Sequence, residues 1–210
     1  MPEIIDLTRP LSRETLGYPG DSRALTVERL EYGVPGMTVS RLSPLDLHAA
    51  THIDAPLHFV PDGSDVADLP LRLLPLRLIR GSTTIEPSDI PDDIAGQAVL
   101  FASGWELPPE TPAYFESFPF LTEGAAAALA ERGAALIGVE SPSVDPAGAS
   151  HNYRAHRILL GAGIPIVEGL CNLDRLNADT RYWFGAFGLP IRGAEASPVR
   201  AIAIVWNDDS

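Results

Sequence analysis

The chain has a single cysteine, Cys171, and no lysine among its 210 residues. One cysteine cannot form an intrachain disulfide or a cysteine-based zinc cage, so any bound metal must take histidine and carboxylate ligands. All fifteen basic residues are arginine. The absence of lysine removes Schiff-base chemistry and the lysine of a phosphate-binding loop.

Positive charge and long apolar runs are also scarce. The formal net charge is −13, which disfavours nucleic acids and acidic membrane surfaces, because both are bound through Lys and Arg contacts to phosphate. No apolar run approaches the roughly 20 residues of a membrane span. The start, MPEIIDLTRPL, has neither the basic nor the apolar region of a secretory signal. We therefore expect a soluble, cytoplasmic protein with no nucleic-acid or membrane partner.

Residues 1–210 contain no internal repeat, low-complexity tract or Gly/Ser linker, so we expect one domain. Segments rich in β-branched and apolar residues predict strands at 3–7, 24–32, 71–81, 97–103, 135–140, 164–170, 181–191 and 199–206. One helix is expected over 121–133, with Thr122 as its N-cap and Gly133 as its stop, and a second over 151–161. Many strands with two helices predict an α/β protein of the mixed α+β kind.

The stretch DLHAATHIDAPLHF, residues 46–59, holds three of the five histidines and two aspartates. A helix does not suit it, because His52 and Asp54 would point to nearly opposite sides and Pro56 would interrupt the helix. In an extended chain the even positions share one face, and these are His48, His52, Asp54 and His58. Neutral imidazoles and a carboxylate are ligands for zinc or manganese, and three such groups with open positions describe a catalytic site.

The alternative interpretation of this stretch is a polar turn with solvated histidines. One histidine alone would favour the turn, but four convergent groups among apolar and small neighbours favour the metal site. The other two histidines lie in the second predicted helix. His151 fits a helix-start residue beside Ser150, whereas His156 precedes an apolar run and is expected to be buried, where an unpartnered imidazole is costly. A predicted strand that carries Glu168 follows this helix.

These residues resemble the metal-dependent cyclase/amidohydrolase family that includes bacterial kynurenine formamidase. The family signature is similar to HxGTHxDxPxHF, and HAATHIDAPLHF at 48–59 stands in register with it, apart from Ala50 in place of glycine. The resemblance continues in YPGD at 18–21, ALIGVESPSVDP at 135–146, AHRILLGAGIPIVEGLCNL at 155–173 and ASPVRA at 196–201. Two further departures are Glu140 for the usual Asp and Tyr18 for a Trp.

The resemblance implies a compact swivelling β/β/α fold and a homodimer whose sites lie near the subunit boundary. It implies that His48, His52 and Asp54 hold one divalent metal. The expected ion is Zn²⁺, with Mn²⁺ as the alternative. It further implies that Asp54 and Glu168 bridge to a second metal, which His156 also holds. One-metal and two-metal occupancy both remain open at this point.

The resemblance also places His58 as the general acid/base and Tyr18 where the formamidases carry a substrate-stacking tryptophan. The chemistry that fits is hydrolysis by a metal-activated water, with His58 moving the proton to the leaving amine. We expect an arylformamidase that converts N-formylkynurenine, or a similar N-acyl arylamine. The alternatives are hydrolysis of another cyclic amide or ester, such as an isatin or a lactone, a cyclisation, and a metal-binding scaffold without turnover.

Overall fold

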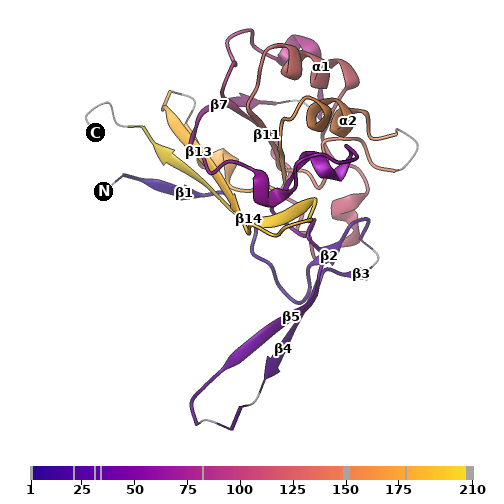
Figure 1. The fold of residues 1–210 in the computed structure, drawn as a ribbon. Helices are drawn as coiled ribbons and strands as arrows, with labels where there is room; N and C mark the ends of the chain where they lie inside the picture. The colour runs from indigo at the N-terminus through magenta and orange to yellow at the C-terminus, as the bar shows by residue number, and fades with distance from the viewer. Residues whose placement is uncertain are drawn as a thin grey trace.

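The computed structural model describes residues 2–20, 22–30, 32–33, 35–81, 83–148, 152–177 and 179–206. Its centre is one sheet, made of β1 (Ile4–Asp6), β6 (His52–Asp54), β7 (Leu74–Arg80), β9 (Ala98–Ala102), β11 (Leu136–Val139), β12 (Ile166–Glu168), β13 (Tyr182–Gly188) and β14 (Ala196–Val205). The strand order is β1-β14-β13-β7-β9-β11-β12-β6, and β6 also pairs with β14. The sheet therefore closes into a barrel-like ring, with β1 outside it on β14 (Figure 1).

The ring combines a parallel half with an antiparallel half. Strands β7, β9, β11 and β12 pair in parallel, whereas β6, β13 and β14 join their neighbours antiparallel. The β9 sequence AVLFA is apolar throughout because both of its faces are buried. Leu100 packs inside the ring with Phe184, whereas Val99 and Phe101 pack outside it against the helices. This confirms the predicted mixed α+β class.

Two helices, α1 (Glu123–Glu131) and α2 (Arg154–Gly161), cover the outer side of this parallel half (Figure 1). As predicted, α1 is capped by Thr122, whose side-chain oxygen accepts the N–H of Ala125 at 3.2 Å. Gly133 follows the helix at φ +73°, in the left-handed region that glycine adopts without strain. The described part of α2 begins at Arg154, and His151 lies outside the described residues.

The other elements are short and lie around the ring. They are β2 (Leu16–Gly17), β3 (Ser22–Arg23), β4 (Leu25–Leu30), β5 (Val39–Leu45), β8 (Thr84–Ile85), β10 (Phe120–Leu121) and the 3-10 turns η1 (Pro56–His58), η2 (Val66–Asp68), η3 (Pro87–Asp89), η4 (Pro112–Phe115) and η6 (Leu173–Arg175). Each of the eight predicted strands coincides with an observed one, usually trimmed by one to three residues. No helix within the described ranges is long and apolar enough to cross a membrane.

Strands β4 and β5 form an antiparallel hairpin that projects from the body of the molecule (Figure 1). We call this hairpin, residues 25–45, the arm. Its side chains are mostly exposed, including Leu42 at 50%, Met37 at 53% and Tyr32 at 62%. The strand β5 was not predicted, because an exposed ribbon has no buried face to impose a hydrophobic alternation on its sequence.

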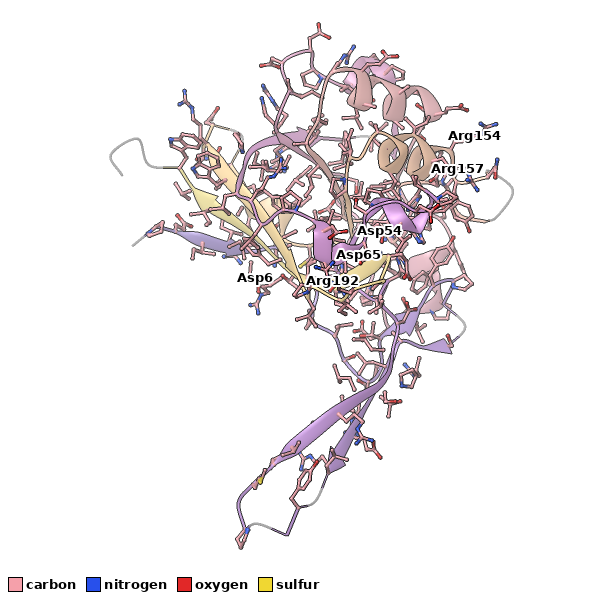
Figure 2. All side chains as sticks on the ribbon, viewed as in Figure 1. Asp6, Asp54, Asp65, Arg154, Arg157 and Arg192 are labelled. Atoms are coloured by element: carbon pink, nitrogen blue, oxygen red, sulfur yellow. The ribbon has the colours of Figure 1, made fainter. Side chains whose placement is uncertain are left out.

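Charged side chains lie mainly at the surface, and the buried Asp54 is an exception. Arg154 and Arg157 extend from the outer face of α2, whereas Asp54 lies within the body and is fully buried (Figure 2).

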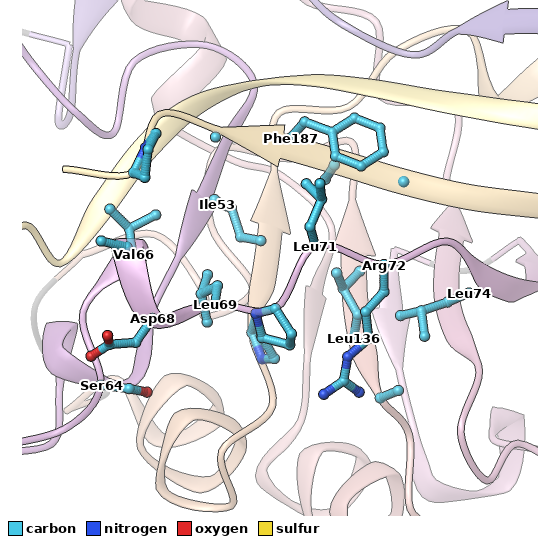
Figure 3. A pocket seen from close by; sticks show the side chains of 18 of the residues that line it. Ile53, Ser64, Val66, Asp68, Leu69, Leu71, Arg72, Leu74, Leu136 and Phe187 are labelled. Carbon is cyan, nitrogen blue, oxygen red and sulfur yellow. The ribbon is translucent and has the colours of Figure 1, made fainter. Parts of the chain in front are cut away.

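A hollow of about 430 Å³ lies beside β6 and is lined by Ile53, Leu69, Leu71, Phe187 and others (Figure 3). No histidine lines it. Because side chains alternate along a strand, Ile53 faces this hollow while its neighbours His52 and Asp54 face the other way.

Candidate active site

The predicted metal-ligating residues come together on adjacent elements. His52 and Asp54 lie on β6, which pairs with β12, and the register places Glu168 directly opposite His52. Directly opposite residues of an antiparallel pair project on the same face of the sheet, so Glu168 joins His52. His156 comes from α2, which packs near β12 and η1.

The predicted extended conformation of residues 46–59 is wrong outside the strand at 52–54. His48 lies in a turn, where its N–H donates to the Asp46 side chain at 2.9 Å. Ala50 then adopts a left-handed conformation at φ +53°. Beyond the strand, Pro56 opens the 3-10 turn η1. His48 and His58 therefore reach the face of His52 through two turns, and not through strand parity.

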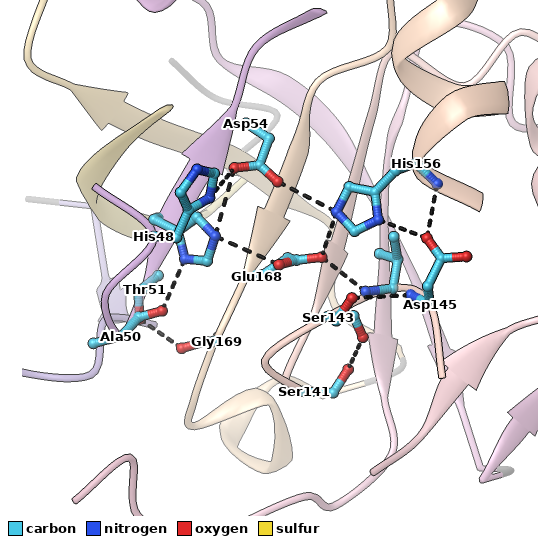
Figure 4. Close-up of polar contacts among 12 residues, drawn as sticks. His48, Ala50, Thr51, Asp54, Ser141, Ser143, Asp145, His156, Glu168 and Gly169 are labelled. Atoms are coloured by element: carbon cyan, nitrogen blue, oxygen red, sulfur yellow. Dashed lines mark hydrogen bonds and ion pairs between the residues drawn. The ribbon is translucent and has the colours of Figure 1, made fainter. Parts of the chain in front are cut away.

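Two buried carboxylates stand between the histidines (Figure 4). Oδ1 of Asp54 lies 3.0 Å from Nδ1 of His48 and 3.5 Å from Nε2 of His52, and Oδ2 lies 3.5 Å from Nε2 of His156. Oε2 of Glu168 lies 3.4 Å from Nε2 of His52, and Oε1 lies 3.2 Å from Nε2 of His156. Each carboxylate thus faces a histidine on either side.

The donor atoms of this cluster fit a divalent metal ion. Nε2 of His52 and both oxygens of Asp54 are buried and, among the described residues, have no partner with hydrogen-bond geometry. Burying unpartnered polar and charged atoms is costly. Ligand atoms bound tetrahedrally at ~2.0–2.1 Å from zinc stand ~3.3–3.4 Å apart. The contacts of 3.2 to 3.5 Å around Asp54 and Glu168 have this spacing.

The remaining nitrogens of two histidines orient their rings. Nδ1 of His52 lies 3.1 Å from the carbonyl oxygen of Ala50, and Nδ1 of His156 lies 2.6 Å from Oδ2 of Asp145. A carbonyl or carboxylate oxygen only accepts, so Nδ1 carries the proton in both rings. The lone pair of each Nε2 then points at the carboxylates, as a metal ligand requires.

Asp145 was not singled out from the sequence, yet it contacts His156 more closely than any other group does. Besides the ring, its carboxylate accepts the backbone N–H of Ala155 at 2.8 Å and that of His156 at 3.0 Å. It therefore caps α2 from a distant loop, since Tyr153 at the N-cap position makes no side-chain cap. The need for such a distant cap becomes visible only once the described helix is seen to begin at Arg154.

The electrostatics favour a bound cation. Burial acts to lower the pKa of His48, but the Asp54 carboxylate outweighs burial and raises it to about 9. Burial likewise opposes charge on His156, yet Glu168 and Asp145 raise its pKa well above the usual value. Burial acts to raise the pKa of Asp54, but the neighbouring histidines hold it well below its usual range. The buried carboxylates are thus stabilised by positive charge, which either protons on the histidines or a metal ion can provide.

His58 lies at the edge of the cluster. Its ring centroid is 4.4 Å from that of His48 and 5.7 Å from that of His156. Burial lowers the pKa of His58 to about 4, so its imidazole is neutral at pH 7. A nitrogen of His58 also lies within 4.8 Å of donor atoms of His48 and Asp54. This position suits a proton acceptor beside the cluster, and it is also close enough for a further ligand.

A hollow of about 260 Å³ opens above the cluster. Its walls are mainly aromatic, and they consist of Tyr18, Phe59, Tyr114, Phe115 and Tyr153, with the site histidines and Glu168 at the base. Of these five aromatic residues only Tyr18 was predicted. Phe59 belongs to the family signature, and Tyr153 precedes α2. The consecutive pair Tyr114 and Phe115 lies in η4, and no local pattern links these three segments. Such a pocket, apolar at the walls and polar at the base, suits an aryl ligand.

Ala50 keeps the backbone shape that a glycine would take at its position. Its carbonyl oxygen accepts from His52 and lies so close to Gly169 that a Cβ there would stand 2.2 Å from it. The hydroxyl of Thr51 donates to the Gly169 carbonyl at 2.6 Å. An alanine in the left-handed region costs about 1–2 kcal/mol. The contacts of Ala50 and Thr51 with Gly169, just after β12, hold that conformation.

Glu140 has a structural role in the described chain. Its Oε2 accepts the hydroxyl of Ser103 at 3.0 Å, the N–H of Gly104 at 2.7 Å and the N–H of Trp105 at 3.3 Å. These bonds fasten the loop after β9. Within the described chain the Glu140 carboxylate is hydrogen-bonded to this loop and to none of the histidines, so its exchange for the usual Asp changes the loop rather than the cluster.

Comparisons with known proteins identify the family of the chain. A model of the family described as putative cyclase matches residues 5–146. Kynurenine formamidase of Bacillus cereus is 33% identical over 95% of this chain and 96% of its own, and that of Salinibacter ruber is 31% identical over the same shares. The solved isatin hydrolase A of Labrenzia aggregata, bound to benzyl benzoate, superposes with a TM-score of 0.81 at 25% identity, over 98% of this chain and 94% of its own.

A second solved structure, a potential metal-dependent hydrolase with cyclase activity, gives a TM-score of 0.78 at 27% identity. It covers 99% of this chain and 100% of its own. The family match stops at residue 146, before His156 and Glu168, but the full-length relatives extend over both. The chain therefore belongs to the cyclase family and is, like these relatives, an amidohydrolase.

Proposed function

We propose that this protein is an arylformamidase that converts N-formylkynurenine, or a similar N-acyl arylamine, to the free amine and formate. The observation that carries the proposal is an aromatic-walled hollow that opens directly onto a buried His/Asp/Glu cluster with unpartnered donor atoms. Relatives named kynurenine formamidase, 33% identical over nearly the full length, support the same substrate class. The aryl ring would lie against the aromatic walls, with the amide toward the cluster.

In this proposal His48, His52 and Asp54 hold one divalent ion, and Asp54, Glu168 and His156 hold a second. Zn²⁺ suits histidine and carboxylate ligands, and Mn²⁺ is the alternative. A divalent ion at this position lowers the pKa of a water molecule and polarises a carbonyl group. The contribution of the protein is to hold the ligands in a buried frame, in which Ala50 and Asp145 orient two of the rings.

His58 is proposed as the general acid/base. Its neutral imidazole can accept a proton from the attacking water as the water oxygen bonds to the formyl carbon. It can then return that proton to the amide nitrogen as the carbon–nitrogen bond breaks, which releases formate and the arylamine. Burial lowers the pKa of His58 to about 4, so its imidazole is unprotonated at neutral pH.

The test is elemental analysis of the purified protein together with hydrolysis assays on N-formylkynurenine. We expect His58→Ala to retain its metal and lose a factor of ~10²–10⁴ in turnover. Activity near that of the wild type would make His58 a packing residue or a replaceable ligand. A metal-loaded wild type that hydrolyses no amide, lactam or lactone would support the scaffold alternative and end the proposal.

Cyclic amides are the second candidate substrate class. The similarity to isatin hydrolase A, with a TM-score of 0.81, favours an isatin-like lactam. The assays therefore include isatin and a simple lactone beside the formyl arylamines. A kcat/KM for isatin far above that for N-formylkynurenine would move the protein to the second class, with the same cluster and the same role for His58.

We also propose that the protein is a homodimer. The arm supports this, because it exposes Met37, Leu42 and Tyr32 to solvent on a ribbon that packs little against the body. Exposed apolar side chains gathered on one feature often mark an interaction surface. Light scattering after size-exclusion chromatography measures the mass directly, and a monomer at micromolar concentration would contradict the proposal.

A further inference from the structure

The hollow of about 430 Å³ beside β6 opens from the interior of the ring. Its lining includes Ile53, Leu136 and Phe184, which belong to the same buried apolar cluster as Leu100 inside the ring. The mouth of a β-barrel is a frequent place for a small-molecule site, and such pockets measure about 300–1,000 Å³. The hollow is of this size, and it lies on the opposite face of β6 from the histidine cluster.

Small residues of β13 leave the space of this hollow open. Gly185, Ala186 and Gly188 all line it. A Cβ built on Gly185 would stand 2.5 Å from the ring of Phe187 and 2.9 Å from the side chain of Leu73. The Phe187 ring can therefore lie over the backbone of β13, where it forms part of the apolar wall.

Segment 69–73 forms the outer wall of the hollow. It connects η2 to β7 without regular secondary structure, and Leu71 within it is 83% exposed. Figure 3 shows Leu71 extending toward Phe187 and Arg72 extending away from it. An apolar side chain this exposed at the mouth of a hollow loses contact with water when a ligand covers it, which favours binding.

Arg72 provides positive charge at the hollow. The polar residues that line it are Ser64, Asp68 and Arg72. The Asp68 carboxylate is paired with the guanidinium of Arg192 at 3.3 Å. Arg72 forms no ion pair with any carboxylate of the described residues. One unpaired guanidinium beside an apolar hollow suits a ligand with a single carboxylate, which a guanidinium can bind in bidentate geometry, and an apolar tail.

We propose that this hollow is a second ligand site, which binds a free aliphatic monocarboxylate with its tail in the hollow and its carboxylate on Arg72. The site is separate from the histidine cluster, because Ile53 faces the hollow while His52 and Asp54 face the other side of β6. The inference does not depend on the proposed amide hydrolysis, since it concerns binding alone.

The test is isothermal titration calorimetry of the metal-loaded full chain with butanoate, hexanoate, octanoate and octanol. Octanol has the apolar tail of octanoate without its charge. The variants are Leu71→Ser and Arg72→Gln, both at exposed positions where a substitution should leave the fold intact. Leu189→Ser and Arg175→Gln are the matched controls, because both residues are exposed and neither lines the hollow.

We expect the affinity of the wild type to rise about fourfold for each methylene group that enters the hollow. Arg72→Gln should lower the affinity for octanoate by about two- to fivefold and leave that for octanol unchanged, since only the charge is lost. Leu71→Ser should lower both affinities by about two- to tenfold, because it removes part of the apolar wall. The two control variants should bind like the wild type.

Absence of octanoate binding, or an affinity that does not rise with chain length, overturns the inference. Octanoate binding that is equal in the wild type, Leu71→Ser and Arg72→Gln also overturns it, because the carboxylate then binds elsewhere, such as on the metal. If octanoate does not bind and Leu71→Ser converts a dimer into a monomer, the hollow is an interface between two copies of the chain and not a ligand site.

Discussion

The contact between Gly169 and Ala50 makes Gly169→Ala the sharpest test of how the site is held. Gly169 follows the proposed ligand Glu168 and has φ +67°. A Cβ at this position would stand 2.2 Å from the Ala50 carbonyl oxygen and 2.8 Å from its carbonyl carbon. Both atoms are backbone, so no side-chain rotation can relieve the collision. The segment that orients His52 must move instead.

The expected cost has three parts. An alanine in the left-handed region costs about 1–2 kcal/mol, offset by about 0.4–1 kcal/mol from a less flexible unfolded chain. Forcing a methyl group into filled space costs about 1–3 kcal/mol. Moving Ala50 and Thr51 also disturbs two hydrogen bonds, to the His52 ring and to the Gly169 carbonyl, each worth about 0.5–1.5 kcal/mol. We expect a loss of about 3–5 kcal/mol in the free energy of unfolding.

The assay is denaturant unfolding of Gly169→Ala beside Gly163→Ala, with elemental analysis of both proteins. Gly163 is a matched control, since it has φ +75° and a Cβ built on it meets nothing within 4 Å. It should lose only the conformational part, about 0.5–1 kcal/mol. The metal content should fall in Gly169→Ala alone. Equal losses of stability in the two variants, with full metal in both, would refute the reasoning.

Three further predictions concern single groups. Asp145→Asn should weaken metal affinity by about 10- to 100-fold in a chelator competition, because it removes the charge that orients His156. The control Asp93→Asn, at a surface ion pair, should leave the metal affinity unchanged. Equal metal affinities of Asp145→Asn and the wild type would show that Asp145 only caps the helix. Glu140→Ala should lower the free energy of unfolding by about 2–3 kcal/mol, since it leaves loop N–H groups unpaired. The metal content should not change. Loss of metal without loss of stability would place Glu140 in the site. Stripping the metal from the wild type with a chelator should abolish turnover, and re-addition of Zn²⁺ or Mn²⁺ should restore it; activity that persists in verified metal-free protein would contradict the proposed chemistry.

Local sequence determined the elements that carry their own signals. The strand β9 could be predicted because both of its faces are buried, which leaves a continuous apolar run. Helix α1 has its cap at Thr122 and its stop at Gly133 within the helix sequence itself. The proposed metal ligands His48, His52 and Asp54 could also be predicted, because they lie within seven residues of one another and a chain so poor in histidine rarely groups them by chance.

Tertiary structure decided what no local pattern could specify. The route by which His48 reaches the cluster depends on a left-handed Ala50 that contacts Gly169, a residue far along the chain. Asp145 meets His156 because a loop beyond β11 passes the start of α2. The aromatic wall brings Tyr18 and Tyr153 together across more than a hundred residues. The cluster itself depends on ring closure, which pairs β6 with both β12 and β14, and pairing between distant strands is not a property of any one segment.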